Sequence, residues 1–235
     1  MDTVLIYTAA SIAVIHTVIG IDHYIPFVVM SKTNNWRIPK TIFIVILCGL
    51  GHVLSSVILG VFGILLGSQL SLLVGIEEFR GELAKWFLMA FGTVYMIWGI
   101  KKAIKNKPHR HTLAGKGEVW HNHDKDAHDI EPIDEHINSR KTSNTFWPLF
   151  ILFVLGPCEP LIPLLMYPAA ESGVMSVVII ALVFSICTIT TMLVCTLVAL
   201  KGISFIPMKK VERYAHALAG FALVVCGITI QVFGL

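Results

Sequence analysis

Charged residues are scarce in this chain. Asp, Glu, Lys and Arg make up 14% of its 235 residues, hydrophobic residues make up 55%, and the mean hydropathy is +0.76. Soluble domains carry roughly 25% charged residues, so this composition cannot cover a water-facing surface. Four windows carry no charge and are long enough to cross a ~30 Å hydrocarbon core as helices: 3–21, 41–76, 172–200 and 214–235. The composition excludes a soluble enzyme, a nucleic-acid binder and a secreted disulfide scaffold, and it predicts an all-α polytopic membrane protein.

Two further absences concern the N-terminus and the cysteines. The first basic residue is Lys32, whereas a secretory signal needs a basic region before its apolar run and a small-residue cleavage site after it. We therefore expect the first apolar segment to be retained as a span. The five cysteines are odd in number and all lie in apolar segments, which argues against an extracellular disulfide framework.

Six spans are predicted, at 4–30, 41–67, 83–104, 145–170, 172–200 and 212–234. The stretch 68–82 carries four charged residues and is interpreted as an amphipathic loop outside the bilayer. Of the 18 Lys and Arg residues, 16 lie in the segments 32–40, 101–141 and 201–213. The positive-inside rule places these three segments in the cytoplasm and both termini outside. The expected location is the cell (inner) membrane, with the lipid bilayer as a partner and no nucleic acid.

The two halves of the chain resemble each other in order and spacing. The segment Gly20–Pro26 resembles Gly156–Pro163, Ser55-Ser56 corresponds to Thr190-Thr191, and the glycine pair Gly92 and Gly99 corresponds to Gly220 and Gly227 at an offset of 128. Three spans in each copy force the copies into opposite orientations, which is a transporter design with broken helices. We therefore predict a 3+3 inverted repeat with broken first and fourth helices. Its parts are a first repeat at 1–105, a cytoplasmic His-rich loop at 106–144 and a second repeat at 145–235.

Six side chains inside the predicted spans form the candidate metal site: His16, Asp22, His23, His52, Cys158 and Glu159. Ionisable groups in hydrocarbon are expensive and usually mark a pathway. Prolines near both Asp22-His23 and Cys158-Glu159 break the helix and free backbone groups that can line a site. Nitrogen, oxygen and thiolate ligands together suit a borderline divalent cation.

The bland interpretations of these residues stay open at this point. The Asp-His pair can satisfy freed backbone groups, His52 can be a hydrogen-bonded core histidine, and Cys158 with Glu159 can be a buried thiol beside a carboxylate that accepts loose N–H groups. His16 precedes His23 by seven residues, about 10 Å along a continuous helix, so the two can share an ion only if the helix unwinds between them. For His216, near a predicted span end, interfacial packing is favoured over ligation.

The loop at 101–144 is polar and rich in histidine. It carries seven acids and six histidines, namely His109, His111, His121, His123, His128 and His136. Such tracts bind metals by composition without needing a fold. We expect weak, exchangeable binding, and the alternative is a solvated linker between the halves.

His16 before Asp22-His23 in a first span, Gly51-His52 in a second, and the His-rich loop resemble the pattern of nickel/cobalt transporters and exporters. These belong to a lysine-exporter-like superfamily that includes UreH-like proteins, TauE/SafE-type sulfite exporters and the thiol–disulfide electron carriers of cytochrome c biogenesis. Gly156–Pro160 looks most like the UreH-like and TauE/SafE-like members. Five residues separate His16 from Asp22 where the nickel/cobalt pattern has four. The electron carriers pair two Pro-Cys elements, whereas here Cys158 corresponds to Asp22-His23.

The expected function is therefore a membrane permease for a divalent transition-metal ion such as Ni²⁺, Co²⁺ or Zn²⁺, operating in efflux. No catalytic residue and no permanently bound cofactor are expected, so the protein is not predicted to be an enzyme. The alternatives are a sulfite-type anion exporter, and a membrane accessory or thiol–disulfide protein in metalloprotein or cytochrome maturation. Glycines at 60, 63 and 67 permit close helix contacts, either within the chain or in a homo-oligomer.

Overall fold

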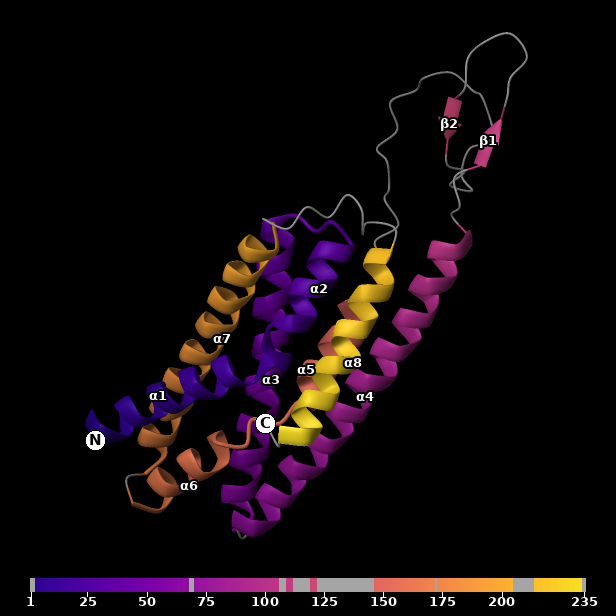
Figure 1. The fold of residues 1–235 in the computed structure, drawn as a ribbon. Coiled ribbons are helices and arrows are strands. Elements are labelled where there is room, and N and C mark those ends of the chain that lie inside the picture. Colours follow the sequence, from indigo (N-terminus) through magenta and orange to yellow (C-terminus); the bar gives the residue numbers. More distant parts are fainter. Residues whose placement is uncertain are drawn as a thin grey trace, which may run out of the picture.

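The computed structural model describes residues 3–67, 70–105, 109–111, 119–121, 146–171, 173–204 and 214–233. Its helices, in chain order, are α1 (Thr3–Ile19), the 3₁₀ helix η1 (Ile21–His23), α2 (Ile25–Thr33), α3 (Ile38–Leu65), α4 (Leu70–Lys105), α5 (Phe146–Leu155), α6 (Leu161–Glu171), α7 (Val174–Ser204) and α8 (Ala215–Phe233). The strands β1 (His109–His111) and β2 (Val119–His121) pair antiparallel, with Arg110 opposite Trp120. The bundle in Figure 1 is helical throughout.

Within the described residues, four helices are long and apolar enough to cross a membrane: α3, α4, α7 and α8. A fifth candidate is the pair formed by α1 and the segment Ile21–Thr33, which bends by 84°. The multi-pass helical membrane protein is thus confirmed, with four to five candidate spans. The predicted span at 145–170 is divided into α5 and α6, because the proline-rich segment between them cannot continue a helix, so the first and fourth predicted helices are both broken, as predicted. Six spans in a 3+3 inverted repeat remain a prediction.

Helix ends follow from local sequence. Pro26 and Pro39 stand in the first turns of α2 and α3, where a missing N–H costs nothing. Gly67 follows α3 with a φ of 61°, the left-handed conformation that commonly ends a helix.

The prediction of a loop at 68–82 is wrong. Helix α4 begins at Leu70 and continues to Lys105. The charges in this stretch suggested contact with water, but Glu77 is fully buried and pairs with Arg80 inside the bundle. The opposite charges satisfy each other, and the helix therefore extends past them.

Helices α4 and α8 lie side by side in Figure 1, and glycines bring them into close contact. A Cβ atom on Gly92 would lie 3.0 Å from the carbonyl oxygen of Gly220. Likewise, Gly99 faces the backbone of Ala217, and Gly227 faces the side chain of Met89. At an offset of 128 these last two contacts exchange with each other, since Gly99 corresponds to Gly227 and Met89 to Ala217. This two-fold exchange supports the predicted duplication.

The other helices cross between the halves in the same manner. Helix α1 packs on α7, whereas α3 packs on α5 and α6. The first element of each half therefore contacts the second element of the other half. In Figure 1, α1 runs across the long helices, as its sharp bend from α2 requires.

We expect Gly99→Ala to destabilise the protein by about 1–3 kcal/mol, because the added methyl group collides with the backbone of Ala217. Gly75→Ala in the same helix is the matched control, since nothing lies within 4 Å of its Cβ position. Thermal unfolding of the detergent-solubilised protein measures both. Equal melting temperatures for the two variants would show that α4 and α8 are not in close contact.

Candidate functional site

Three histidines from separate elements meet inside the bundle: His16 from α1, His23 from η1 and His52 from α3. Their ring centroids lie 4.9 Å apart for His16 and His23, and 5.1 Å apart for His23 and His52. Each histidine offers one ring nitrogen, and these three nitrogen atoms lie within 4.8 Å of one another. We call this group the histidine cluster. It is the only group of three or more His, Cys, Asp or Glu side chains in the described residues that could hold a metal ion.

The break at Gly20 creates the cluster. Gly20 is extended, with φ −70° and ψ 92°, so the helical path stops after Ile19 and turns by 84°. On a continuous helix His16 and His23 would stand about 10 Å apart. The condition that the helix must unwind between them is therefore met. A side chain at position 20 would also collide with the His23 ring, since a Cβ there lies 2.5 Å from its Nδ1.

Hydrogen bonds orient two of the rings. Nδ1 of His52 lies 3.2 Å from the carbonyl oxygen of Phe153. Nδ1 of His23 lies 3.1 Å from both the carbonyl oxygen of Gly20 and Oδ1 of Asp22. Carbonyl and carboxylate oxygens accept hydrogen bonds, so the partners assign the proton to Nδ1 in both rings.

The opposite ring nitrogens are left without partners. The Nε2 atoms of His16, His23 and His52 are all buried, and none has a hydrogen-bond partner in the part of the chain that the structure describes. Buried polar atoms are normally satisfied, so three orphans in one place need an explanation. A histidine that donates from one nitrogen to an oxygen and offers the other as a lone pair is the usual metal-binding arrangement. The geometry fits a metal ion held by Nε2 atoms.

The other predicted ligands lie outside the cluster. Asp22 is a hydrogen-bond partner of His23 and acts on the cluster through that ring. Cys158 is fully buried in a hydrophobic cluster with Leu161 and Phe184. Glu159 is exposed and lines the cavities beside the cluster. The structure thus brings together three of the six predicted residues, His16, His23 and His52. Asp22 contacts this group through its hydrogen bond to His23.

Two cavities reach the histidine cluster. One of about 50 Å³ is lined by His23 and His52, and another of about 360 Å³ is lined by His16 and His23. Asp22 and Glu159 line both. The smaller cavity has room for one or two waters at about 30 Å³ each. An ion therefore has an approach to the cluster that passes two carboxylates.

Sequence reasoning missed Glu77 and Arg80, which hold the second break in place. Arg80 pairs with Glu77, and its Nη2 donates to Oγ of Ser55 at 2.6 Å and to the carbonyl oxygen of Val154 at 2.7 Å. The backbone N–H of Cys158 donates to Oε2 of Glu77 at 3.1 Å. The pair thus satisfies backbone groups that the break between α5 and α6 frees. Its one signal in the sequence is opposite charge at a spacing of three residues, which the loop interpretation passed over.

His216 lies away from the cluster and has partners of its own. Its Nδ1 lies 2.9 Å from the hydroxyl of Tyr95, and its Nε2 lies 3.2 Å from Nζ of Lys102. It packs from α8 against α4, and its position at the membrane interface remains a prediction. In the His-rich loop, His109, His111 and His121 fall in the two strands, and the predicted chelating groups at 121–129 and His136 lie largely outside the described residues.

Fold and site together define a multi-pass helical membrane protein with a buried histidine cluster at a broken helix. The family model described as the cytochrome C biogenesis protein transmembrane region matches residues 25–229, and the chain belongs to this family. The chain matches no curated protein and no solved structure significantly. Cytochrome c biogenesis proteins were among the expected relatives. The match gives no support to the nickel/cobalt exporter, UreH-like or TauE/SafE-like resemblances, which remain predictions.

Replacing Arg80 by Met should destabilise the protein by about 3–5 kcal/mol, because it leaves the fully buried carboxylate of Glu77 without its partner. The double variant Glu77→Gln, Arg80→Met removes both charges and should recover much of this loss. Thermal unfolding in detergent measures the three proteins. If the single variant is as stable as the parent, the pair does not hold the break between α5 and α6.

Proposed function

We propose that the protein is a membrane accessory protein of metalloprotein maturation that carries a transition-metal ion through the histidine cluster. One observation carries this proposal: three histidines bring ring nitrogens within 4.8 Å of one another, and their buried Nε2 atoms have no hydrogen-bond partner among the described residues. Membership in the cytochrome c biogenesis family supports the maturation role. The ion is the cargo, and no catalytic residue or resident cofactor is part of the proposal.

The surroundings of the cluster suit a cation. Both adjacent cavities are lined by Asp22 and Glu159, whose carboxylates attract a cation and repel an anion. The Arg80 side chain, which could bind an anion, is already occupied by Glu77 and backbone carbonyls. Export of a sulfite-type anion therefore has less support than movement of a metal ion.

In the proposed mechanism the chain's own residues position the ion. Phe153 and Asp22 hold the Nδ1 atoms of the His52 and His23 rings, which leaves Nε2 of each ring as the atom that would bind the ion. The break at Gly20 supplies the third ring and opens the cavity beside it. Efflux follows if the His-rich loop is cytoplasmic and collects the ion there, as the distribution of basic residues predicts.

A thiol–disulfide relay is the second candidate, and the family match favours it. The cysteines argue against a thiol–disulfide relay. All five are free, and Cys158 is fully buried at the break where an electron carrier needs an exchangeable thiol. Its counterpart in the first half is Asp22-His23, which has no thiol.

The histidine cluster is tested by metal binding to the purified full-length protein in detergent. We expect one equivalent of Ni²⁺, Co²⁺ or Zn²⁺ to bind tightly, beside weak binding to the His-rich loop, and His52→Ala to abolish the tight binding, because it removes one of three ligands. His216→Ala is the control, since its partners are Tyr95 and Lys102. Loss of binding in both variants, or in neither, would contradict a site at the cluster.

Asp22→Asn should weaken metal binding about 10–100-fold without abolishing it, as is typical when a partner behind a ligand histidine is changed. The amide of asparagine is similar in size to the carboxylate but carries no charge. The substitution therefore changes the orientation and the basicity of the His23 ring. Competition with a chromogenic chelator measures the affinity. An unchanged affinity would mean that His23 does not bind the ion.

An experiment in cells that express each variant distinguishes the two candidate functions. Metal handling predicts that His52→Ala abolishes maturation of a c-type cytochrome or another metalloprotein while Cys158→Ser retains it. A relay predicts the reverse. Haem staining or activity of the target protein is the readout, and immunoblotting confirms equal amounts of each variant in the membrane.

A further inference from the structure

Four sulfur-containing side chains gather in the core beside the histidine cluster: Met30 from α2, Cys48 from α3, Met192 from α7 and Cys226 from α8. Met30, Cys48 and Met192 are fully buried, and Cys226 is 2% exposed. They belong to one hydrophobic cluster, which also contains Phe153, the residue whose carbonyl group orients His52. Thioether and thiol groups are soft ligands, which prefer soft cations such as monovalent copper.

Two of the sulfur-containing residues lie one turn from a ligand histidine. Cys48 and His52 are four residues apart on the buried face of α3, about 6 Å along the helix axis. The sulfur of Met192 lies 3.4 Å from the position that a Cβ of Gly49 would take, which places it against the same turn of α3. Glycine at this position lets the Met192 sulfur approach the helix next to Cys48.

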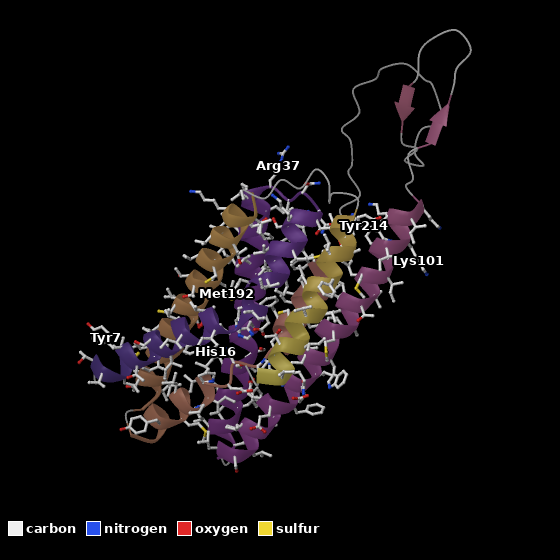
Figure 2. All side chains as sticks on the ribbon, viewed as in Figure 1. Tyr7, His16, Arg37, Lys101, Met192 and Tyr214 are labelled. Carbon is white, nitrogen blue, oxygen red and sulfur yellow. The ribbon has the colours of Figure 1, made fainter. Side chains whose placement is uncertain are left out.

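Met30 extends the sulfur groups towards the basic end of the bundle. The amide nitrogen of Asn34 lies 3.8 Å from its sulfur, and Asn34 follows Lys32 at the end of α2. Figure 2 shows Met192 between His16 and the end of the bundle that carries Arg37, Lys101 and Tyr214. The two cavities beside the cluster are lined by Asp22 and Glu159, which offer oxygen ligands. The cluster thus has both oxygen-lined cavities and sulfur-containing core residues in its neighbourhood.

The charge of the cluster points to the same cation. Its three ligand nitrogens are neutral lone-pair donors, and the one carboxylate hydrogen-bonded to it is that of Asp22. A monovalent ion together with this carboxylate leaves no net charge, whereas a divalent ion also needs the carboxylate of Glu159, which is exposed and lines the cavities beside the cluster. Uncompensated charge is costly in the interior of a membrane bundle.

We propose that the cargo of the histidine cluster is monovalent copper, exchanged with the basic end of the bundle along the sulfur atoms of Met192, Cys48 and Met30. This inference rests on the proposed metal-handling function and names its substrate. The ion keeps its charge throughout, so no oxidant or reductant is needed. Methionine and cysteine also serve as ordinary core residues, and the experiments below separate the two roles.

The first experiment measures which ion the full-length protein binds. Ag⁺, a redox-inert probe for monovalent copper, is compared with Ni²⁺ and Zn²⁺ by competition and elemental analysis, in the parent and in His52→Ala. We expect Ag⁺ to bind more tightly than either divalent ion, and His52→Ala to lose it. Tighter binding of Ni²⁺ or Zn²⁺ would overturn the monovalent assignment but leave the proposed function standing. Absence of binding by all three ions would overturn both.

The second experiment tests the sulfur route by transport. In proteoliposomes, Cys48→Ser with Met192→Leu should slow Ag⁺ uptake about 10–100-fold, the usual size of effect when groups next to a metal site are changed. Ag⁺ should still bind to this variant, because the three histidines are retained. Met30→Leu, a near-isosteric change, should also slow uptake. Met175→Leu is the matched control, because its side chain is 72% exposed and lies outside the sulfur group. Uptake at the control rate in both test proteins would overturn the route, with gel filtration and thermal unfolding confirming that each variant is folded.

Discussion

A helix that breaks inside hydrocarbon has to find partners for the backbone groups that it frees, because no water is present to bind them. This constraint shapes both ends of the site. At Gly20 the chain turns through 84°, and the freed carbonyl oxygen of Gly20 accepts a hydrogen bond from His23. At the break after α5, His52 donates a hydrogen bond to the carbonyl oxygen of Phe153, and Arg80 donates one to the carbonyl oxygen of Val154. The polar side chains of the core are therefore placed where the two breaks need them.

The same hydrogen bonds give the histidine cluster its chemistry. Once Nδ1 of His23 and of His52 is committed to an oxygen acceptor, the Nε2 atoms are left as lone-pair donors. Two cavities reach the cluster. In the packed core beside it, Phe27 stacks on Phe153, and the sulfur of Met192 lies against the turn of α3 that carries Cys48. The three histidines therefore lie between cavities that contain carboxylates and a core that contains sulfur groups.

Local sequence was sufficient for much of the architecture. Long charge-free windows and punctuating prolines located the helices and both broken points, and repeated glycines indicated that α4 and α8 resemble each other. It was insufficient where charges compensate one another through space. Glu77 and Arg80 suggested a loop in water, whereas their mutual pairing and contacts to α3 and α5 keep them inside α4. Spacing along a helix likewise separated His16 from His23, and only the bend at Gly20 brings them together.

By itself, the sequence determined that this protein is a helical membrane protein with two proline-flanked breaks, because hydropathy and proline act over a few residues. The family match agrees with a membrane region of the cytochrome c biogenesis type. Only the tertiary structure decided which of the candidate ligands meet. It selected His16, His23 and His52, turned Asp22 into a partner of His23, and placed Cys158 in an apolar core. The physical reason is that ligand geometry depends on how helices cross and bend, and these angles are set by packing between residues far apart in the chain.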